Sequence, residues 1–124
     1  MPTLYGRVFR LDPLTGDNLY GTSPLFDFGE DFHPIGAGVS LYRDTSGVLH
    51  GLIASGGFVD PFSPSGTEWA PDDVNQYAVG FPIEADVAPV TRAQVAADST
   101  LGVYIDFGAG QRAFSAPVIA GGEV

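Results

Sequence analysis

The sequence predicts a small all-β protein, a β-sandwich or barrel with two hairpins, one short helix and long loops rich in proline and glycine. Short runs in which apolar and polar residues alternate recur along the chain, and 17 glycines and 10 prolines separate them. A helical pattern is confined to one short segment. At 124 residues, 44% of them hydrophobic, the chain has the size of one domain with one core. We therefore expect residues 1–124 to form a single β domain.

The first half of the chain contains the clearest predicted element. Residues 3–11 alternate well enough for an opening strand, and the turn-forming residues at 12–18 predict a tight connection after it. Residues 38–43 and 47–54 are β-prone runs joined by a short polar loop, which is typical of a hairpin. The sequence therefore predicts a hairpin over these two runs.

The second half supplies the remaining regular elements. Residues 75–83 predict another strand, and residues 91–98 predict a short helix whose first threonine is suited to cap it. Residues 101–107 alternate again and are expected to turn at 108–110. The chain then returns over 112–119 as an edge strand, because a proline in this arm cannot donate to a ladder.

Two irregular segments, residues 18–38 and 55–75, carry large aromatic side chains on backbone rich in proline and glycine. Exposed rings of this size would endanger a free monomer, so we interpret both segments as arms that cover a protein partner. The alternative is that they cover the open ends of the chain's own sheets. Residues 120–124 are expected to be loose. The predicted partner contacts are Phe26, Phe28, Phe32, Phe58, Phe62 and Trp69.

The formal net charge is −10, from 15 acidic residues against five basic ones, and all five bases are arginines. A charge of this sign repels phosphate backbones and anionic lipids, which argues against nucleic acid and membranes as partners. We expect protein partners instead, namely the chain itself and a larger assembly. The lack of cysteine excludes a disulfide framework and thiolate metal sites. No secretory signal is recognised at the N-terminus, so we expect a cytoplasmic protein unless a virion incorporates it.

One acidic cluster offers candidate ligands for a metal ion. Asp27, Glu30, Asp31 and His33 lie within seven residues of one another. Oxygen ligands suit Ca²⁺, and a histidine among carboxylates suits Zn²⁺ or Mn²⁺. The spacing matches no established metal-binding loop, and some clustering is expected in a chain with 15 acids. We therefore expect a solvated acidic loop and no cofactor, with bound Ca²⁺ as the alternative.

Residues 103–109 resemble the strand and turn that carry the catalytic aspartate of retroviral-type aspartic proteases. In that family threonine or serine follows the aspartate and its hydroxyl braces the catalytic pair, whereas Phe107 follows Asp106 here. We therefore expect Asp106 to be an ordinary strand residue. His33 and His50 are candidate bases, but no serine lies in a nucleophile context. The sequence predicts a protein that is not an enzyme, and a small β-barrel hydrolase is the second alternative.

In composition and predicted architecture the chain resembles small structural proteins of tailed bacteriophages, the head decoration or cement proteins and small tail or neck components. The resemblance implies a protein that stabilises a larger lattice, such as a capsid or tail, through its aromatic loops. It also implies a place in the virion after synthesis in the host cytoplasm. The main alternative is a carbohydrate- or ligand-binding β module in which Trp69 and Tyr77 stack on the ligand and acidic residues hold Ca²⁺.

Overall fold

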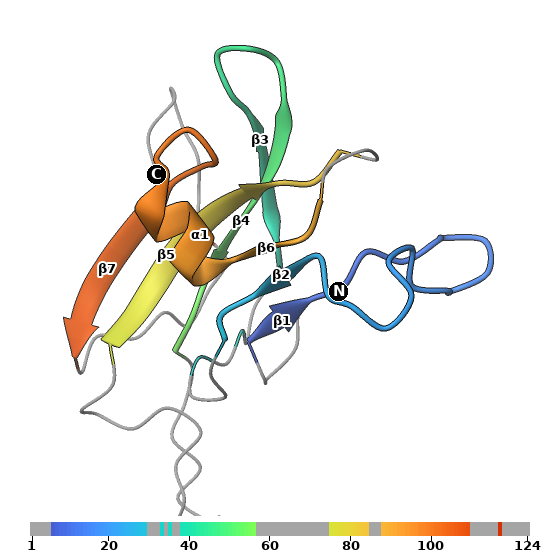
Figure 1. The fold of residues 1–124 in the computed structure, drawn as a ribbon, viewed down its shortest axis with the longest axis horizontal. Helices are drawn as coiled ribbons and strands as arrows, with labels where there is room; N and C mark the ends of the chain where they lie inside the picture. Colours follow the sequence, from blue (N-terminus) through green and yellow to red (C-terminus); the bar gives the residue numbers. More distant parts are fainter. Residues whose placement is uncertain are drawn as a thin grey trace, which may run out of the picture.

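The fold consists of two β-sheets and one short helix, which confirms the predicted all-β class (Figure 1). A computed structural model of the chain describes residues 6–29, 33, 35, 38–56, 75–84, 88–109 and 117. The larger sheet is antiparallel and has the strand order β3-β4-β5-β7, formed by Ser40–Arg43, Leu49–Ala54, Asn75–Pro82 and Tyr104–Ala109. The smaller sheet has the order β1-β2-β6, formed by Arg7–Val8, Phe26–Asp27 and Val90–Thr91, and is followed by helix α1, Arg92–Ala97.

The β3–β4 hairpin forms as predicted because its loop satisfies its own backbone groups. The Asp44 carboxylate accepts hydrogen bonds from the amides of Ser46 at 2.8 Å and Val48 at 2.9 Å. Gly47 adopts a φ of +85°, a conformation that other residues rarely adopt, and its amide donates to the Asp44 carbonyl at 3.0 Å. The polar loop that suggested the hairpin is therefore also what closes it.

Strand β5 lies at the centre of the larger sheet, and it confirms the strand predicted for residues 75–83. Its alternate residues Tyr77, Val79 and Phe81 all belong to the core or pack against it, as their spacing of two requires. A β-bulge interrupts its pairing with β7 between Gln76 and Tyr77.

Strand β7 differs from the prediction in where it ends. A turn was expected at residues 108–110, but Gly108 and Ala109 remain in the strand and pair with Gln76 and Asn75 of β5. Residues 108 and 109 extend β7 because they can hydrogen-bond to β5, and local turn propensity does not take a neighbouring strand into account. Gly108 has a φ of +79°, a conformation that glycine adopts easily at the irregular end of a strand. The expected return strand falls on residues outside the described part of the chain, apart from Pro117.

Helix α1 confirms the short helix predicted for residues 91–98. Thr91 is its N-cap, and its hydroxyl accepts from the Gln94 amide while the Gln94 side chain accepts from the Thr91 amide, which makes a reciprocal capping box. Val95 is the buried residue of this helix and anchors it to the core.

The smaller sheet was not predicted. Of the opening strand expected over residues 3–11, the structure has only Arg7–Val8 as a strand, and residues 1–5 lie outside the described part. Phe26–Asp27 pairs antiparallel with this strand and parallel with Val90–Thr91. Strands of two residues show no alternation, and this pairing joins segments far apart in the chain, so no local pattern indicates it.

The core lies between the two sheets, and it contains two of the predicted partner contacts. Phe26 is 0% exposed and stacks on Phe81, with ring centroids 4.5 Å apart and planes at 10°. Phe28 is 2% exposed and packs edge-on against Phe26 at 5.1 Å. The prediction that these two rings cover a partner was therefore wrong: Phe26 belongs to the short strand β2, Phe28 follows it, and both side chains enter the chain's own interior. This is the alternative stated for the first aromatic arm.

The remaining predicted partner contacts cannot be placed. Phe32, Phe58, Phe62 and Trp69 lie outside the described residues, as does the expected loose end at 120–124. The description of the second arm, predicted over 55–75, stops at Gly56 and resumes at Asn75. The interface prediction for these four rings therefore stays a prediction.

Candidate partner-binding site

The loop between β1 and β2 projects away from both sheets, on the opposite side of the molecule from β7 (Figure 1). We call residues 11–20 of this connection the leucine loop. Leu11 and Asn18 form an isolated antiparallel bridge at its base. Above the bridge, the Asp12 amide donates to the Asp17 carbonyl at 2.8 Å and the Gly16 amide donates to the Asp12 carbonyl at 2.8 Å. The loop is therefore a closed turn that holds its own backbone.

Side chains within the leucine loop satisfy further backbone donors. The Asp12 carboxylate accepts from the Leu14 amide at 2.8 Å, and the Thr15 hydroxyl accepts from the Asp17 amide at 3.2 Å. Asn18 accepts from the Tyr20 amide at 3.1 Å and donates to a carbonyl further along the connection at 2.8 Å. These are the local Asx and hydroxyl bonds that the turn chemistry of residues 12–18 predicts.

This ordered loop presents apolar side chains to solvent. Leu14 is 93% exposed, Leu19 is 52% exposed and Leu11 is 36% exposed. Single exposed leucines are ordinary on protein surfaces, but three on one short projecting turn form a concentrated apolar contact. Two carboxylates, Asp12 and Asp17, lie beside them in the sequence.

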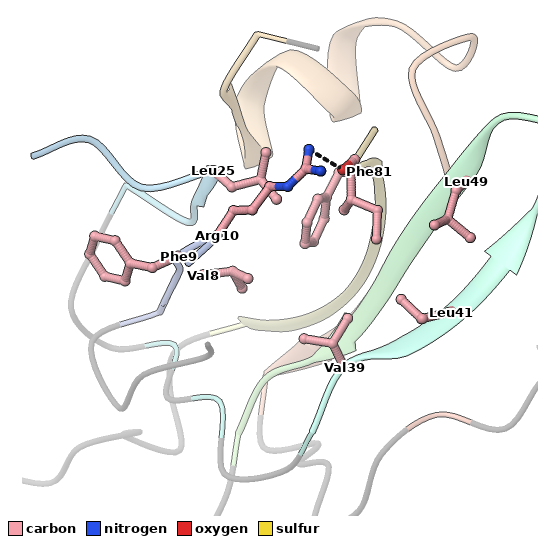
Figure 2. Close-up of a pocket in the computed structure, with 9 residues that line it drawn as sticks. Val8, Phe9, Arg10, Leu25, Val39, Leu41, Leu49 and Phe81 are labelled. Carbon is pink, nitrogen blue, oxygen red and sulfur yellow. Dashed lines mark hydrogen bonds between the residues drawn. The ribbon is translucent and has the colours of Figure 1, made fainter. Parts of the chain in front are cut away.

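An apolar cavity of about 270 Å³ adjoins the base of the leucine loop. Figure 2 shows Val8 and Leu25 on one side of it and side chains of the β3–β4 hairpin on the other. Leu41 is 59% exposed at the hairpin side, so the cavity opens to solvent there. Its apolar lining includes Val8, Leu25, Val39, Leu49, Phe81 and Ile83.

Arg10 is the charged member of this lining. Its Nη1 donates to the Ile83 carbonyl at 2.7 Å, which holds the guanidinium over the cavity (Figure 2). Within the described ranges of the chain, Arg10 has no carboxylate within ion-pair distance. A guanidinium has five N–H donors in a planar fork, so most of this donor capacity is left for an anionic group.

The predicted metal ligands that the structure describes have other partners. The Asp27 carboxylate lies 3.4 Å from Nε of Arg7 and accepts from the Gly29 amide at 2.8 Å. His33 is buried, and its Nδ1 lies 3.2 Å from Oε1 of Gln76. Glu30 and Asp31 are outside the described residues. In the part that is described, no group of three or more histidine and acidic side chains is placed to hold a metal ion.

His33 belongs to a buried polar network below the aromatic core. The Ser55 hydroxyl donates to Oε1 of Gln76 at 2.8 Å and accepts from the Tyr77 amide at 3.0 Å. His33, Ser55 and Gln76 are all buried. The network satisfies polar groups of β5 beside the bulge in its pairing with β7, which is a structural role.

Tyr77, the predicted ligand-stacking residue, already has several partners around its ring. The Arg92 guanidinium carbon lies 4.7 Å from the ring centroid, and the Tyr104 ring lies 5.5 Å away. Burial raises the pKa of the Tyr77 hydroxyl, and the Arg92 charge opposes that rise. The ring therefore packs within the protein instead of lying free for a sugar.

Asp106 is an exposed residue of β7, as predicted for an ordinary strand position. Its carboxylate accepts from the Gly108 amide at 2.8 Å and from Nδ2 of Asn75 at 3.2 Å. His50, the other candidate base, is buried beneath Tyr42, whose ring stacks on it at 4.9 Å. Among the described side chains, these contacts of Asp106 and His50 do not form a catalytic arrangement.

Sequence reasoning missed the leucine loop as a contact surface. It interpreted residues 12–18 only as a connection and looked for partner contacts among the aromatics. The available signal was the placement of leucines inside a turn-rich sequence, where no alternating pattern can carry them into a core. Arg10 gave no signal of its own.

Comparisons with protein families, with curated proteins and with solved structures find no match for this chain. None of the described helical residues form a helix with the length and apolar character needed to cross a membrane.

Proposed function

We propose that this chain is a non-catalytic assembly protein that binds a protein partner through the leucine loop. The observation that carries the proposal is Leu14, which is 93% exposed at a turn held by its own hydrogen bonds. A side chain in this position contributes nothing to the chain's own core. Its removal from water on binding is therefore available to stabilise a complex.

The energetics of such a contact are favourable for two reasons. Burying one leucine side chain contributes about 1.5–3 kcal/mol. The loop already satisfies most of its backbone donors before binding, so little further chain entropy is lost when a partner covers it. An ordered apolar projection therefore binds more effectively than a disordered segment of the same composition.

In its finer form, the proposal places this protein on a larger lattice such as a phage capsid or tail. The support for this form is the resemblance in composition and architecture to small structural proteins of tailed bacteriophages. The strongly acidic surface agrees with a protein partner and not with nucleic acid. The protein would then be made in the host cytoplasm and carried in the virion.

The test is sedimentation of the full chain through a density gradient, from lysates of its native source. The wild type and an Ile105→Asp control are expected to sediment with a large particle. Leu14→Asp is expected to remain at the top of the gradient. Ile105 is a suitable control because it is also exposed and apolar, but it lies on β7, away from the loop. If Leu14→Asp sediments like the wild type, the leucine loop is not the contact.

A further inference from the structure

We infer that the leucine loop binds a second copy of this chain, with Leu14 of each copy entering the apolar cavity of the other. The inference rests on the proposed function, because it names the partner of the same loop. Both halves of the contact are present in one chain: an exposed leucine on an ordered projection and an open apolar cavity.

The two halves match in size and polarity. An apolar cavity of about 150 Å³ already accommodates a benzene molecule. The cavity here is about 270 Å³ and is lined by aliphatic and aromatic side chains, including Val8, Leu25 and Ile83. It is therefore large enough for a leucine side chain, and its walls offer no competing polar group except Arg10.

The two halves also match in charge. Arg10 lies over the cavity and has no carboxylate partner in the described part of its own chain. Asp17 follows Leu14 by three residues, and among described groups its carboxylate has no ion-pair partner. When Leu14 enters the cavity of another copy, Asp17 approaches Arg10 of that copy. An apolar anchor flanked by a carboxylate is the occupant that this cavity fits.

The position of the halves allows a closed dimer. The chain leaves the cavity wall at Arg10 and enters the loop at Leu11, so the cavity adjoins the base of the loop. When one surface carries both a projection and its receptor, a two-fold rotation brings each projection to the other copy's receptor. The contact is then made twice and leaves no open end.

The net charge of −10 on each copy opposes this association. At physiological salt the screening length is about 8 Å, so distant charges contribute little while the close Arg10–Asp17 pair is screened less. The association is therefore measured at physiological salt.

The first experiment is sedimentation equilibrium of the purified full chain between about 10 µM and about 1 mM, a range that covers weak protein dimers. The wild type and Ile105→Asp are expected to show a monomer–dimer equilibrium with the same Kd. Leu14→Asp and Leu41→Asp are each expected to raise the Kd by at least about tenfold, because one removes the anchor and the other places a negative charge on the apolar wall of the cavity.

The second experiment tests whether the contact lies between copies, through a charge exchange. Arg10→Glu and Asp17→Arg are each expected to weaken the dimer, because like charges then meet twice. An equimolar mixture of the two variants is expected to regain wild-type association, because every pair in the mixed dimer is again opposite in charge. A contact within one chain would show no such recovery on mixing.

A variant that does not fold must not be mistaken for one that does not bind. Circular dichroism and thermal melting establish the fold of each variant first. If Arg10→Glu fails this check, a mixture of Leu14→Asp with Leu41→Asp replaces the charge exchange. That mixed dimer keeps one of the two contacts, whereas each variant alone keeps none, so the mixture is expected to associate more tightly than either.

A wild type that stays monomeric over the whole range overturns the inference, as does a mixture of folded variants that fails to recover. The proposed function is judged separately by the density gradient. If the pure wild-type chain is monomeric but Leu14→Asp no longer sediments with the large particle, the loop binds a different protein. In that case only the inference of self-association is rejected. If Leu14→Asp behaves as the wild type in both experiments, both proposals fall.

Discussion

The larger sheet and the leucine loop treat apolar side chains in opposite ways. In β4 and β5, Leu52, Ile53, Val79 and Phe81 are completely buried, and their strands satisfy backbone groups by pairing with neighbours. In the loop, the backbone is satisfied by bonds within a few residues, and Leu14 and Leu19 remain in solvent. One region uses apolar side chains to hold the fold together. The leucine loop exposes apolar side chains to solvent and does not need them for its own hydrogen-bonded structure.

This difference predicts that stability and association can be changed separately in this chain. Substitutions in the larger sheet should lower the free energy of unfolding, whereas substitutions at the loop's tip should change association alone. Substitutions in the two regions test that separation, and the larger sheet is least able to accept an added side-chain atom at Gly102.

Replacing Gly102 with alanine is expected to have a large effect, lowering the free energy of unfolding by about 3 kcal/mol or more. A Cβ at this position would lie 1.9 Å from the Gly80 carbonyl oxygen of β5, and the backbone on both sides would have to move. Urea titration measures the loss. Gly38→Ala is the matched control, because a Cβ there meets nothing within 4 Å. A Gly102→Ala variant as stable as the control would mean that the sheet adapts more easily than its packing indicates.

The same contrast explains what the sequence could predict. The β3–β4 hairpin, β5 and helix α1 were predicted because alternation, a turn and an N-cap threonine are local signals. The smaller sheet was missed because its strands are two residues long and find partners across the chain. Local patterns cannot report pairing that depends on distant segments.

The candidate site was harder to predict than the fold. Aromatic density suggested Phe26 and Phe28 as partner contacts, but a ring's burial depends on where its short strand is placed. Leu14 and Leu19 lie in a part of the sequence without alternation, but nothing in the sequence showed that they project from the surface, and Leu11 was assigned to the opening strand. The cavity depends on residues of five separate stretches of the chain, and nothing in their spacing brings them together.

Replacing Ser55 with alanine is expected to lower the free energy of unfolding by about 1–3 kcal/mol, the cost of leaving buried polar groups unpaired. Its hydroxyl joins Gln76 to the Tyr77 amide beside the bulge in the β5–β7 pairing. Urea titration measures the change, and Ser46→Ala in the exposed hairpin loop is the control. Equal stability of the two variants would show that the buried network is dispensable to the larger sheet.

Stability is expected to fall as the pH rises beyond about 10, the ordinary pKa of tyrosine. Burial, with a further contribution from the Asp44 charge, raises the pKa of the Tyr42 hydroxyl in the folded state. The unfolded chain therefore loses this proton at lower pH than the folded chain, and ionisation favours unfolding. The stabilisation is complete below about pH 10 and is lost as the pH rises through the higher folded pKa.

Tyr42→Phe tests this alkaline response. The variant is expected to lose less stability than the wild type between pH 9 and pH 11, in unfolding titrations at about one-unit steps. The decline should be reduced and not abolished, because burial also raises the pKa of Tyr77. No lysine titrates in this range, since the chain has none. If the free energy of unfolding of Tyr42→Phe falls with pH as steeply as that of the wild type, groups other than Tyr42 cause the alkaline response.

The smallest effect is expected at the tip of the leucine loop. Leu14→Ala should leave the free energy of unfolding of the dilute chain within about 0.5 kcal/mol of the wild type, because a side chain this exposed has no contacts to lose. Phe81→Ala is the matched truncation in the larger sheet, and the loss of its stacking on Phe26 should cost about 3–5 kcal/mol. Both values come from urea titration at concentrations too low for association. A loss above about 1 kcal/mol for Leu14→Ala would mean that the loop supports the fold, and the separation between stability and contact would fail.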